Sequence, residues 1–177
     1  ADGLALLDLQ EAARARAGGW RKPILLLEGF FAPADLPVVD ELRLTSTIHH
    51  PAQVAMLRAF RPRAPVEVYV KVDTGMKRLG FAPAETAGVV EALTALPMVR
   101  VASLMTHFAN ADRADADAGP ASVADQLHRF DEACRGWPGA RCVANSAALL
   151  LHPQAGGDAV RPGIALYGST PMAGRAA

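Results

Sequence analysis

Residues 65–81 read PVEVYVKVDTGMKRLGF, and this stretch decides the fold class. Its first half is rich in valine and is typical of a buried strand, and its second half is a polar, glycine-containing turn. A helix is expected over residues 84–96, because apolar residues recur there at helical spacing and Pro83 and Pro97 bracket the segment. A second apolar run, residues 99–106, predicts the next strand. Strand, helix and strand in this order indicate a parallel sheet covered by helices.

The same alternation continues in both directions from this stretch. We expect strands over residues 24–28, 43–48, 66–72, 99–106, 141–144 and 160–167, and helices over 8–17, 51–60, 84–96 and 122–134. About six strands are too few for a closed eight-stranded barrel, which takes about 250 residues. The pattern therefore leaves two readings, an open doubly wound sheet or most of a barrel with its ends missing. No G-x-G-x-x-G follows the first strand, which argues against a doubly wound sheet that binds a dinucleotide.

Composition and charge argue against several classes of partner. The chain of 177 residues is 51% hydrophobic, which favours one domain over residues 1–177, and its 18 basic residues balance 18 acidic ones. A balanced charge gives no reason to expect nucleic acid or an anionic membrane as a partner. Apolar runs are too short to cross a bilayer, and no signal-peptide pattern is found. Cys134 and Cys142 are interpreted as reduced thiols of a cytoplasmic protein, and His49-His50 lacks a third metal ligand.

Two clusters of polar residues follow predicted strands, where a parallel barrel places its active site. The loop from Lys71 to Phe81 carries Lys71 and Arg78, and the planar guanidinium of Arg78 suits a carboxylate. The alternative is a solvated turn with its charges outside, in which Asp73 only forms the turn. His107 directly follows the strand over 99–106. It could act as a base, a stacking platform or a satisfied core residue.

Two further clusters lie nearer the C-terminus. Asn145 and Ser146 end a strand ahead of an alanine run, and a hydroxyl with unpaired backbone N–H groups suits a phosphate. The alternative is an ordinary helix N-cap. Arg161 stands beside the Pro162-Gly163 turn, which puts a permanent charge next to free backbone N–H groups. Here the alternative is a buried arginine paired with a carboxylate such as Asp158.

Taken together, four motifs resemble alanine racemase, a pyridoxal-phosphate (PLP) enzyme of fold type III with an eight-stranded α/β barrel. They are KVDTGMKRLGF at 71–81, MTHFANAD at 105–112, ANSAA at 144–148 and VRPGIALYG at 160–168, and PILLLEGFF at 23–31 is also similar. Four motifs in order are specific where any single one is not. The resemblance implies an α/β fold, an incomplete parallel (β/α)8 barrel (TIM-like) without its N-terminal strand and the C-terminal β-domain.

The resemblance also implies cofactor contacts. Ser146 resembles the hydroxyl that holds the PLP phosphate, with the backbone of Gly163 and Ile164, and Asn145 adjoins it. Arg161 resembles the group that hydrogen-bonds the pyridine nitrogen of PLP. An arginine there leaves this nitrogen unprotonated, whereas a carboxylate would protonate it.

Three residues resemble parts of the substrate side of the site. Arg78 resembles the residue that orients the substrate carboxylate and the catalytic tyrosine. Lys71 resembles a lysine that is carbamylated in some members and then contacts that arginine. His107 resembles the histidine that supports the cofactor ring. The implied substrate is a small amino acid, and the implied complete enzyme is a cytoplasmic homodimer that supplies D-alanine for the cell wall.

The family's two catalytic bases have no counterpart among these motifs. The PLP lysine lies in a motif like AVVKANAYGHG, and none of Lys22, Lys71 and Lys77 has that context. Tyr69 and Tyr167 lie in predicted strands and are poor candidates for the tyrosine of the partner subunit. We therefore expect the chain to start after the first barrel strand, to stop before the second domain, and not to racemise alanine alone.

Three alternatives stay open at this point. One is a non-catalytic PLP-binding barrel of the same fold that acts in cofactor homeostasis. A second is another amino-acid racemase or a fold type III decarboxylase, which would differ around the carboxylate contacts. The third is a truncated gene product without activity.

Overall fold

A computed structural model of the chain describes residues 1–113 and 121–172. Within these described residues, seven parallel strands alternate with helices and are hydrogen-bonded in sequence order. The strands are β1 (Leu4–Leu6), β2 (Ile24–Leu26), β3 (Thr45–Ile48), β4 (Val66–Lys71), β5 (Val99–Met105), β6 (Ala140–Asn145) and β7 (Ala159–Arg161). The α-helices are α1 (Leu9–Ala17), α2 (Leu36–Glu41), α3 (Pro51–Ala59), α4 (Thr86–Thr94), α5 (Val123–Ala133) and α6 (Ser146–Leu151). Short 3-10 helices are η1 (Pro33–Asp35), η2 (Pro83–Glu85), η3 (Pro153–Ala155) and η4 (Ile164–Tyr167).

This strand order confirms the predicted fold class, an incomplete parallel (β/α)8 barrel. In an open doubly wound sheet the strand order reverses at a switch point, and no reversal occurs between β1 and β7. Parallel neighbours connected by helices are the repeating unit of the barrel. The carboxyl ends of the strands therefore carry the loops in which a site is expected.

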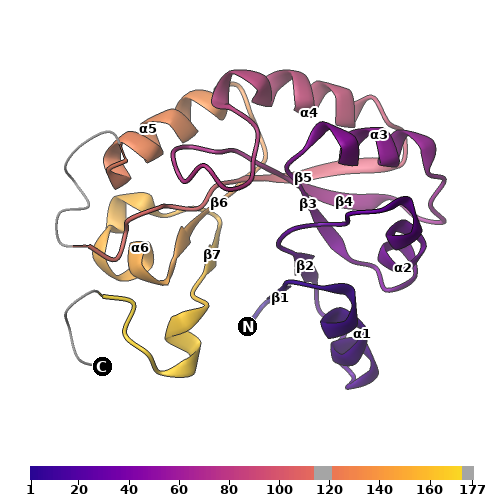
Figure 1. Cartoon of the computed structure of the whole chain (residues 1–177), viewed down its shortest axis with the longest axis horizontal. Helices are drawn as coiled ribbons and strands as arrows, with labels where there is room; N and C mark the ends of the chain where they lie inside the picture. The colour runs from indigo at the N-terminus through magenta and orange to yellow at the C-terminus, as the bar shows by residue number, and fades with distance from the viewer. Residues whose placement is uncertain (114–120, 173–177) are drawn as a thin grey trace. The chain divides into compact units, whose positions relative to one another are not determined.

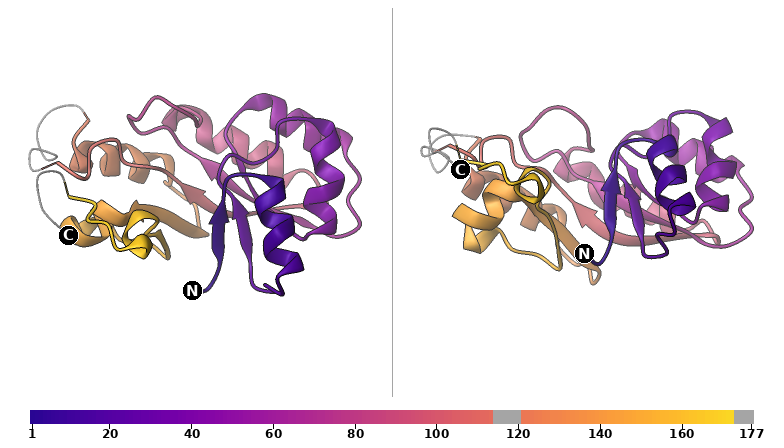
Figure 2. Two further views of the ribbon diagram at one scale, coloured as in Figure 1. Left: turned by 60° about the horizontal axis from the view of Figure 1, so that its bottom comes forward. Right: turned by 90° about the horizontal axis from the view of Figure 1, so that it is seen from below.

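The chain divides into two compact units. The first comprises residues 1–71 and 87–102, and the second comprises residues 72–86 and 103–177. In the first unit, β1 to β4 lie side by side, with α1, α2 and α3 along them (Figure 2). Alternate β4 residues Val66, Val68 and Val70 are buried, as the valine pattern predicts.

The second unit is built around the end of β5, β6 and β7. The register pairs Ser103 with Ala140 and Met105 with Cys142, so the carboxyl ends of β5 and β6 are neighbours. Helix α6 follows β6 directly and packs against it (Figure 1). Phe108 and Phe130 are among the largest fully buried side chains. This apolar packing holds the loops after β5 and β6 in place.

Most element predictions are confirmed within two residues at each end, and the last strand is wrong. A strand was expected over residues 160–167, but β7 ends at Arg161 and residues 164–167 form η4. Pro162 has no N–H for a sheet, and the Gly163 N–H donates to the Arg161 carbonyl at 2.8 Å. The apolar run after Gly163 therefore turns instead of extending.

Three elements were missed by the sequence analysis. Strand β1 has only three residues, too few for a periodicity to register. Helix α2 contains Pro37, which resembles a break but lies in the first turn, where proline costs no hydrogen bond. Helix α6 begins at Ser146, where only the possibility of a helix was considered. The stretch over residues 109–118 is rich in alanine and aspartate, a composition typical of a surface loop. Its residues 109–113 form a loop and turn, and 114–118 lie outside the described residues.

Candidate functional site

Arg161 lies at the end of β7, and its guanidinium binds the ends of the neighbouring strands. Nη2 donates to the carbonyls of Thr106 at 2.6 Å and Val143 at 3.2 Å. Nη1 donates to the carbonyl of Cys142 at 3.0 Å and contacts its Sγ at 2.8 Å. These contacts fix the plane of the guanidinium at the carboxyl edge of β5, β6 and β7.

The alternative pairing of Arg161 with Asp158 is not formed. Asp158 instead accepts from the backbone N–H of Arg141, at 2.8 Å. The guanidinium of Arg161 instead contacts backbone carbonyls and a sulfur atom. A charge held by dipoles and not neutralised by a carboxylate keeps its attraction for an acceptor or an anion.

Ser146 brings the end of β6 to the turn after β7. Its side chain is buried, and Oγ accepts from the N–H of Ala165 at 3.2 Å. Gly163, two residues earlier, has open space where a Cβ would stand. Asn145 Oδ1 accepts from the N–H of Ala148 at 2.9 Å and caps α6. The structure thus gives Asn145 the N-cap role, while Ser146 faces the Gly163–Ala165 turn.

The loop after β4 is a tight turn organised by Asp73. Its Oδ1 accepts from the backbone N–H groups of Gly75 and Lys77, each at 3.0 Å. Lys77 adopts a positive φ of 54°, and Gly75 one of 152°. The interpretation of Asp73 as a turn-forming residue is confirmed. Arg78, one residue beyond Lys77, is exposed.

Two threonines connect this loop to the loop after β5. Thr106 Oγ1 donates to the carbonyl of Val72 at 2.9 Å and lies 2.8 Å from Thr74 Oγ1. Both threonines are buried. His107, which follows Thr106, is half-buried. The sequence analysis did not select either threonine, although both lie in the motifs that follow β4 and β5.

In the first unit, Lys71 is the last residue of β4 and is buried. The alternative of a solvated strand end is therefore wrong for Lys71, while Arg78 is exposed as that alternative predicted. Arg78, His107, Ser146, Arg161, Gly163, Ile164 and Asn145 all lie in the second unit. Within that unit the structure joins Arg161, Ser146 and the turn after β7, and joins the two loops that carry Arg78 and His107.

His49 and His50 lie between the end of β3 and the start of α3. His50 caps α3, with Nδ1 accepting from the N–H of Ala52 at 3.1 Å. His49 Nε2 lies 2.9 Å from the carbonyl of Glu28, so this nitrogen is the protonated one. Burial lowers the pKa of His49, and the charge of Lys71 lowers it further, against the opposing hydrogen bond to Glu28. His49 is thereby biased toward the neutral form.

The lowered pKa of His49 makes the chain acid-sensitive. Since the folded chain releases this proton more readily than the unfolded chain, the unfolded state takes up more protons as the pH falls. The contribution to stability is therefore present above the ordinary histidine value of about 6.5 and is lost below it, as pH falls through the lowered pKa. Urea unfolding at pH 8 to 5 is expected to give a smaller loss for His49→Gln than for the natural chain. An equal loss would contradict the assignment.

Several negative findings apply to residues 1–113 and 121–172. No cluster of three or more His, Cys, Asp or Glu side chains suited to a metal ion is found there. No described helix has the length and apolar character needed to cross a membrane. Cys134 and Cys142 are both free. Burial raises the pKa of Cys134 to about 11, so its thiol stays protonated near neutral pH and is a poor nucleophile.

Comparison with known proteins identifies relatives over nearly the whole chain. The family model described as alanine racemase, N-terminal domain, matches residues 1–171. The alanine racemase of Sodalis glossinidius is 50% identical over 170 residues, covering 96% of this chain and 46% of that protein. The alanine racemase of Ralstonia nicotianae is 48% identical over 171 residues, covering 97% and 44%. The chain thus spans about half the length of the curated relatives it matches.

Solved structures agree with these matches. The biosynthetic alanine racemase of Pseudomonas aeruginosa superposes with a TM-score of 0.91 at 40% identity, covering 99% of this chain and 48% of that one. The alanine racemase of E. faecalis gives a TM-score of 0.87 at 30% identity, covering 100% and 48%. The barrel fold expected from the four motifs is therefore also the fold of these proteins.

Proposed function

Because the chain belongs to the alanine racemase N-terminal domain family, we propose that it forms the barrel part of a PLP-dependent alanine racemase. The single observation that carries this proposal is the meeting of Ser146 with the turn after β7. A hydroxyl, the N–H of Ala165 and the open space at Gly163 lie together at one strand edge. Hydroxyl and backbone N–H donors are what a phosphate monoester needs.

Arg161 fits the same cofactor from the neighbouring position. Its guanidinium is held by backbone carbonyls, and no described carboxylate within ion-pair distance neutralises it. Arginine stays protonated at all working pH values, so it can donate to a ring nitrogen but cannot protonate it. When bound, PLP supplies the electron-withdrawing ring that makes the α-hydrogen of alanine acidic. Ser146, Arg161 and the Gly163–Ile164 backbone hold and orient it.

The substrate side of the proposal rests on two loops. Exposed Arg78 offers a planar pair of donors to the carboxylate of a small amino acid. His107 lies on a loop that Thr74 and Thr106 join to the loop of Arg78, and it would support the cofactor ring. Lys71, in the first unit, is proposed to correspond to the lysine that is carbamylated in some members of the family, a modification that would add a carboxylate to its side chain. These residues bind and orient, whereas the two bases that move the α-proton are proposed to come from groups outside these motifs.

In the cell, this activity would supply D-alanine to cell-wall synthesis in the cytoplasm, in a homodimer. Residues 1–177 alone are proposed to be inactive in racemisation. The rival function, a non-catalytic PLP-binding barrel, predicts the same phosphate site. It differs in one result, because no form of that protein would interconvert L- and D-alanine.

The test is titration of the chain with PLP and, separately, with inorganic phosphate, followed by absorbance and calorimetry. Ser146→Ala is expected to weaken both affinities about tenfold or more, since a hydrogen bond to a charged group contributes about 1.5–3 kcal/mol. The matched control is Ser103→Ala, a buried hydroxyl that donates to the carbonyl of Ala140 at the opposite end of β6. This variant should bind PLP like the natural chain.

Two results separate the candidate functions. Conversion of L-alanine to D-alanine by the longest reading frame that contains residues 1–177 supports the racemase. PLP binding without conversion supports the non-catalytic barrel. An absence of PLP binding in both the chain and that frame would overturn the proposal. Racemisation by residues 1–177 alone would show that the two bases do not come from groups outside these motifs.

A further inference from the structure

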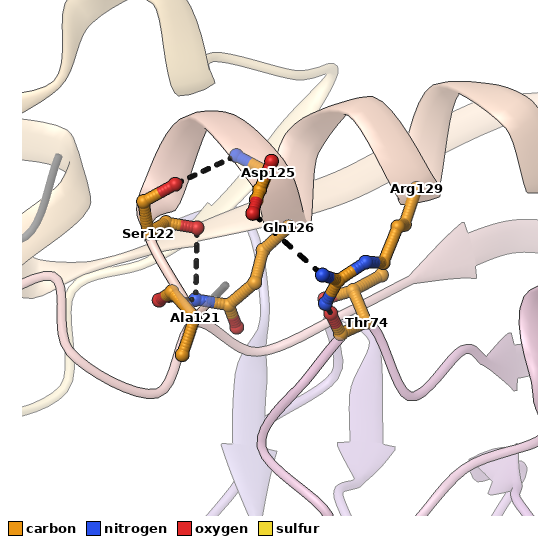
Figure 3. Close-up of polar contacts among 6 residues, drawn as sticks. All are labelled: Thr74, Ala121, Ser122, Asp125, Gln126 and Arg129. Carbon is orange, nitrogen blue, oxygen red and sulfur yellow. Dashed lines mark hydrogen bonds and ion pairs between the residues drawn. The ribbon is translucent and has the colours of Figure 1, made fainter. Parts of the chain in front are cut away.

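Arg129 of α5 binds the backbone of the loop that carries Arg78. Its Nη1 donates to the carbonyl of Thr74 at 2.8 Å (Figure 3). Its Nη2 lies 3.7 Å from Asp125 Oδ2, one helical turn earlier, so the guanidinium is held from the helix side as well. A Cβ added to Gly75 would stand 3.3 Å from Arg129 Nη1, which places the loop in close contact with α5. Arg129 therefore fixes the start of the 74–81 turn.

Gln126, one turn before Arg129, binds the loop that carries His107. Its Oε1 accepts from the N–H of Ala109 at 3.1 Å, and the side chain is fully buried. Its Nε2 donates to the carbonyls of Ala121 at 2.7 Å and Ser122 at 3.3 Å (Figure 3). A backbone carbonyl can only accept a hydrogen bond, and in a glutamine amide only the nitrogen can donate one. The two carbonyls therefore determine the orientation of the Gln126 amide. Its oxygen is left to hold Ala109.

The start of α5 is itself fixed. Ser122 Oγ accepts from the N–H of Asp125 at 3.0 Å and caps the helix. The hydroxyl pair Thr74 and Thr106 then joins the two loops to each other. One helix thus anchors both loops through two side chains, neither of which has a role in the assignments above.

We propose that Gln126 and Arg129 are positioning residues for the reaction, Arg129 acting through Arg78 and Gln126 through His107. This inference rests on the proposed function. It predicts different effects for the two residues, one on substrate affinity and one on PLP affinity. Loss of Arg129 loosens the group that meets the substrate carboxylate, so substrate affinity falls. Loss of Gln126 loosens the group that supports the cofactor ring, so PLP affinity falls.

The first test is amide hydrogen exchange, which needs neither cofactor nor turnover. Arg129→Met is expected to speed exchange at residues 75–80 about fivefold or more, the effect of one lost hydrogen bond. Gln126→Met is expected to do the same at residues 107–111. Arg129 is partly exposed, so its variant should fold and keeps the proposal testable. Arg129→Lys keeps a donor and should restore part of the protection.

Two matched controls remove general effects. Arg135→Met deletes an exposed arginine just after α5 and should leave exchange at 75–80 unchanged. Gln10→Leu deletes an exposed amide of the first unit and should leave exchange at residues 107–111 unchanged. If the α5 variants speed exchange no more than these controls do, the positioning role is wrong, whatever the chain binds.

The second test uses the longest reading frame that contains residues 1–177. Arg129→Met is expected to raise the KM for alanine about tenfold with a smaller fall in kcat, which marks lost substrate binding. Gln126→Met is expected to raise the Kd for PLP and leave the KM at saturating PLP nearly unchanged. Equal losses in both variants and both constants would overturn the division of roles. A natural frame that binds no PLP would refute the proposed function, while the exchange data would still decide whether α5 holds the two loops.

Discussion

Replacing Gly29 with alanine is expected to destabilise the chain by about 3 kcal/mol or more, a large fraction of the roughly 5–15 kcal/mol by which folded proteins are stable. Gly29 follows β2 with φ of 70°, a conformation that costs an L-residue about 1–2 kcal/mol. An added Cβ would also stand 2.2 Å from the carbonyl oxygen of Thr47 and 2.7 Å from Gln53 Nε2. Since the nearest atom is backbone, the clash can be relieved only by moving β3.

Two other glycines separate the cost of the backbone strain from the cost of the steric clash. Gly19 has φ of 92° but nothing within reach of an added Cβ, so Gly19→Ala should cost only the backbone strain, about 1–2 kcal/mol. Gly88 lies exposed within α4, also in open space, and Gly88→Ala should stabilise by about 0.5–1 kcal/mol. Urea unfolding of the three variants measures the series. A Gly29 variant no less stable than the Gly19 variant would show that β3 moves freely.

Whether an element could be predicted from the sequence depends on whether local or more distant interactions determine it. Local patterns predicted the strands and helices around residues 65–106, because a valine run and two prolines leave few alternatives there. The course of the chain after Arg161 could not be predicted in this way. The run Ile164–Tyr167 is as apolar as a strand, but it forms η4, because Pro162 has no N–H for a sheet and the Gly163 N–H donates to the Arg161 carbonyl.

The site shows the same limit. The four motifs contain every residue assigned a contact, since each lies at the end of a strand. Gln126 and Arg129 were not found, because polar residues one turn apart on an amphipathic helix ordinarily face solvent. Gln126 is instead fully buried, and its partner Ala109 is 17 positions away. A contact of this separation leaves no periodic trace in one sequence.

Gln53 gives the second large effect, because one buried amide holds two loops of the first unit. Its Oε1 accepts from the N–H groups of His49 at 2.8 Å and His50 at 3.2 Å. Its Nε2 donates to the carbonyl of Phe30 at 3.0 Å, with the carbonyls of Glu28 and Thr47 at 3.3 and 3.4 Å. Apart from Thr47, which lies in β3, these backbone groups belong to the loops after β2 and β3, where no neighbouring strand provides hydrogen-bond partners.

Gln53→Leu is therefore expected to destabilise the chain by about 3 kcal/mol, because several buried backbone groups lose their partner at once and each costs about 1–3 kcal/mol before water compensates. The control is Gln10→Leu, an exposed glutamine of α1, which should change stability by less than about 0.5 kcal/mol. Urea unfolding gives the difference, and an unchanged midpoint would mean that water replaces the amide without loss.

A variant that keeps half of the contacts tests the mechanism behind this loss. Gln53→Glu retains an oxygen for His49 and His50 but turns a carboxylate toward the three carbonyls, which raises the pKa of the new carboxyl. A raised carboxyl pKa means that the folded state binds the proton more tightly, so this variant should gain stability relative to Gln53→Leu as the pH falls. The protonated oxygen can then donate to Phe30 as the amide does. If the two variants instead lose stability in parallel from pH 8 to 5, the donor half of the amide contributes little, and the loop after β3 alone depends on Gln53.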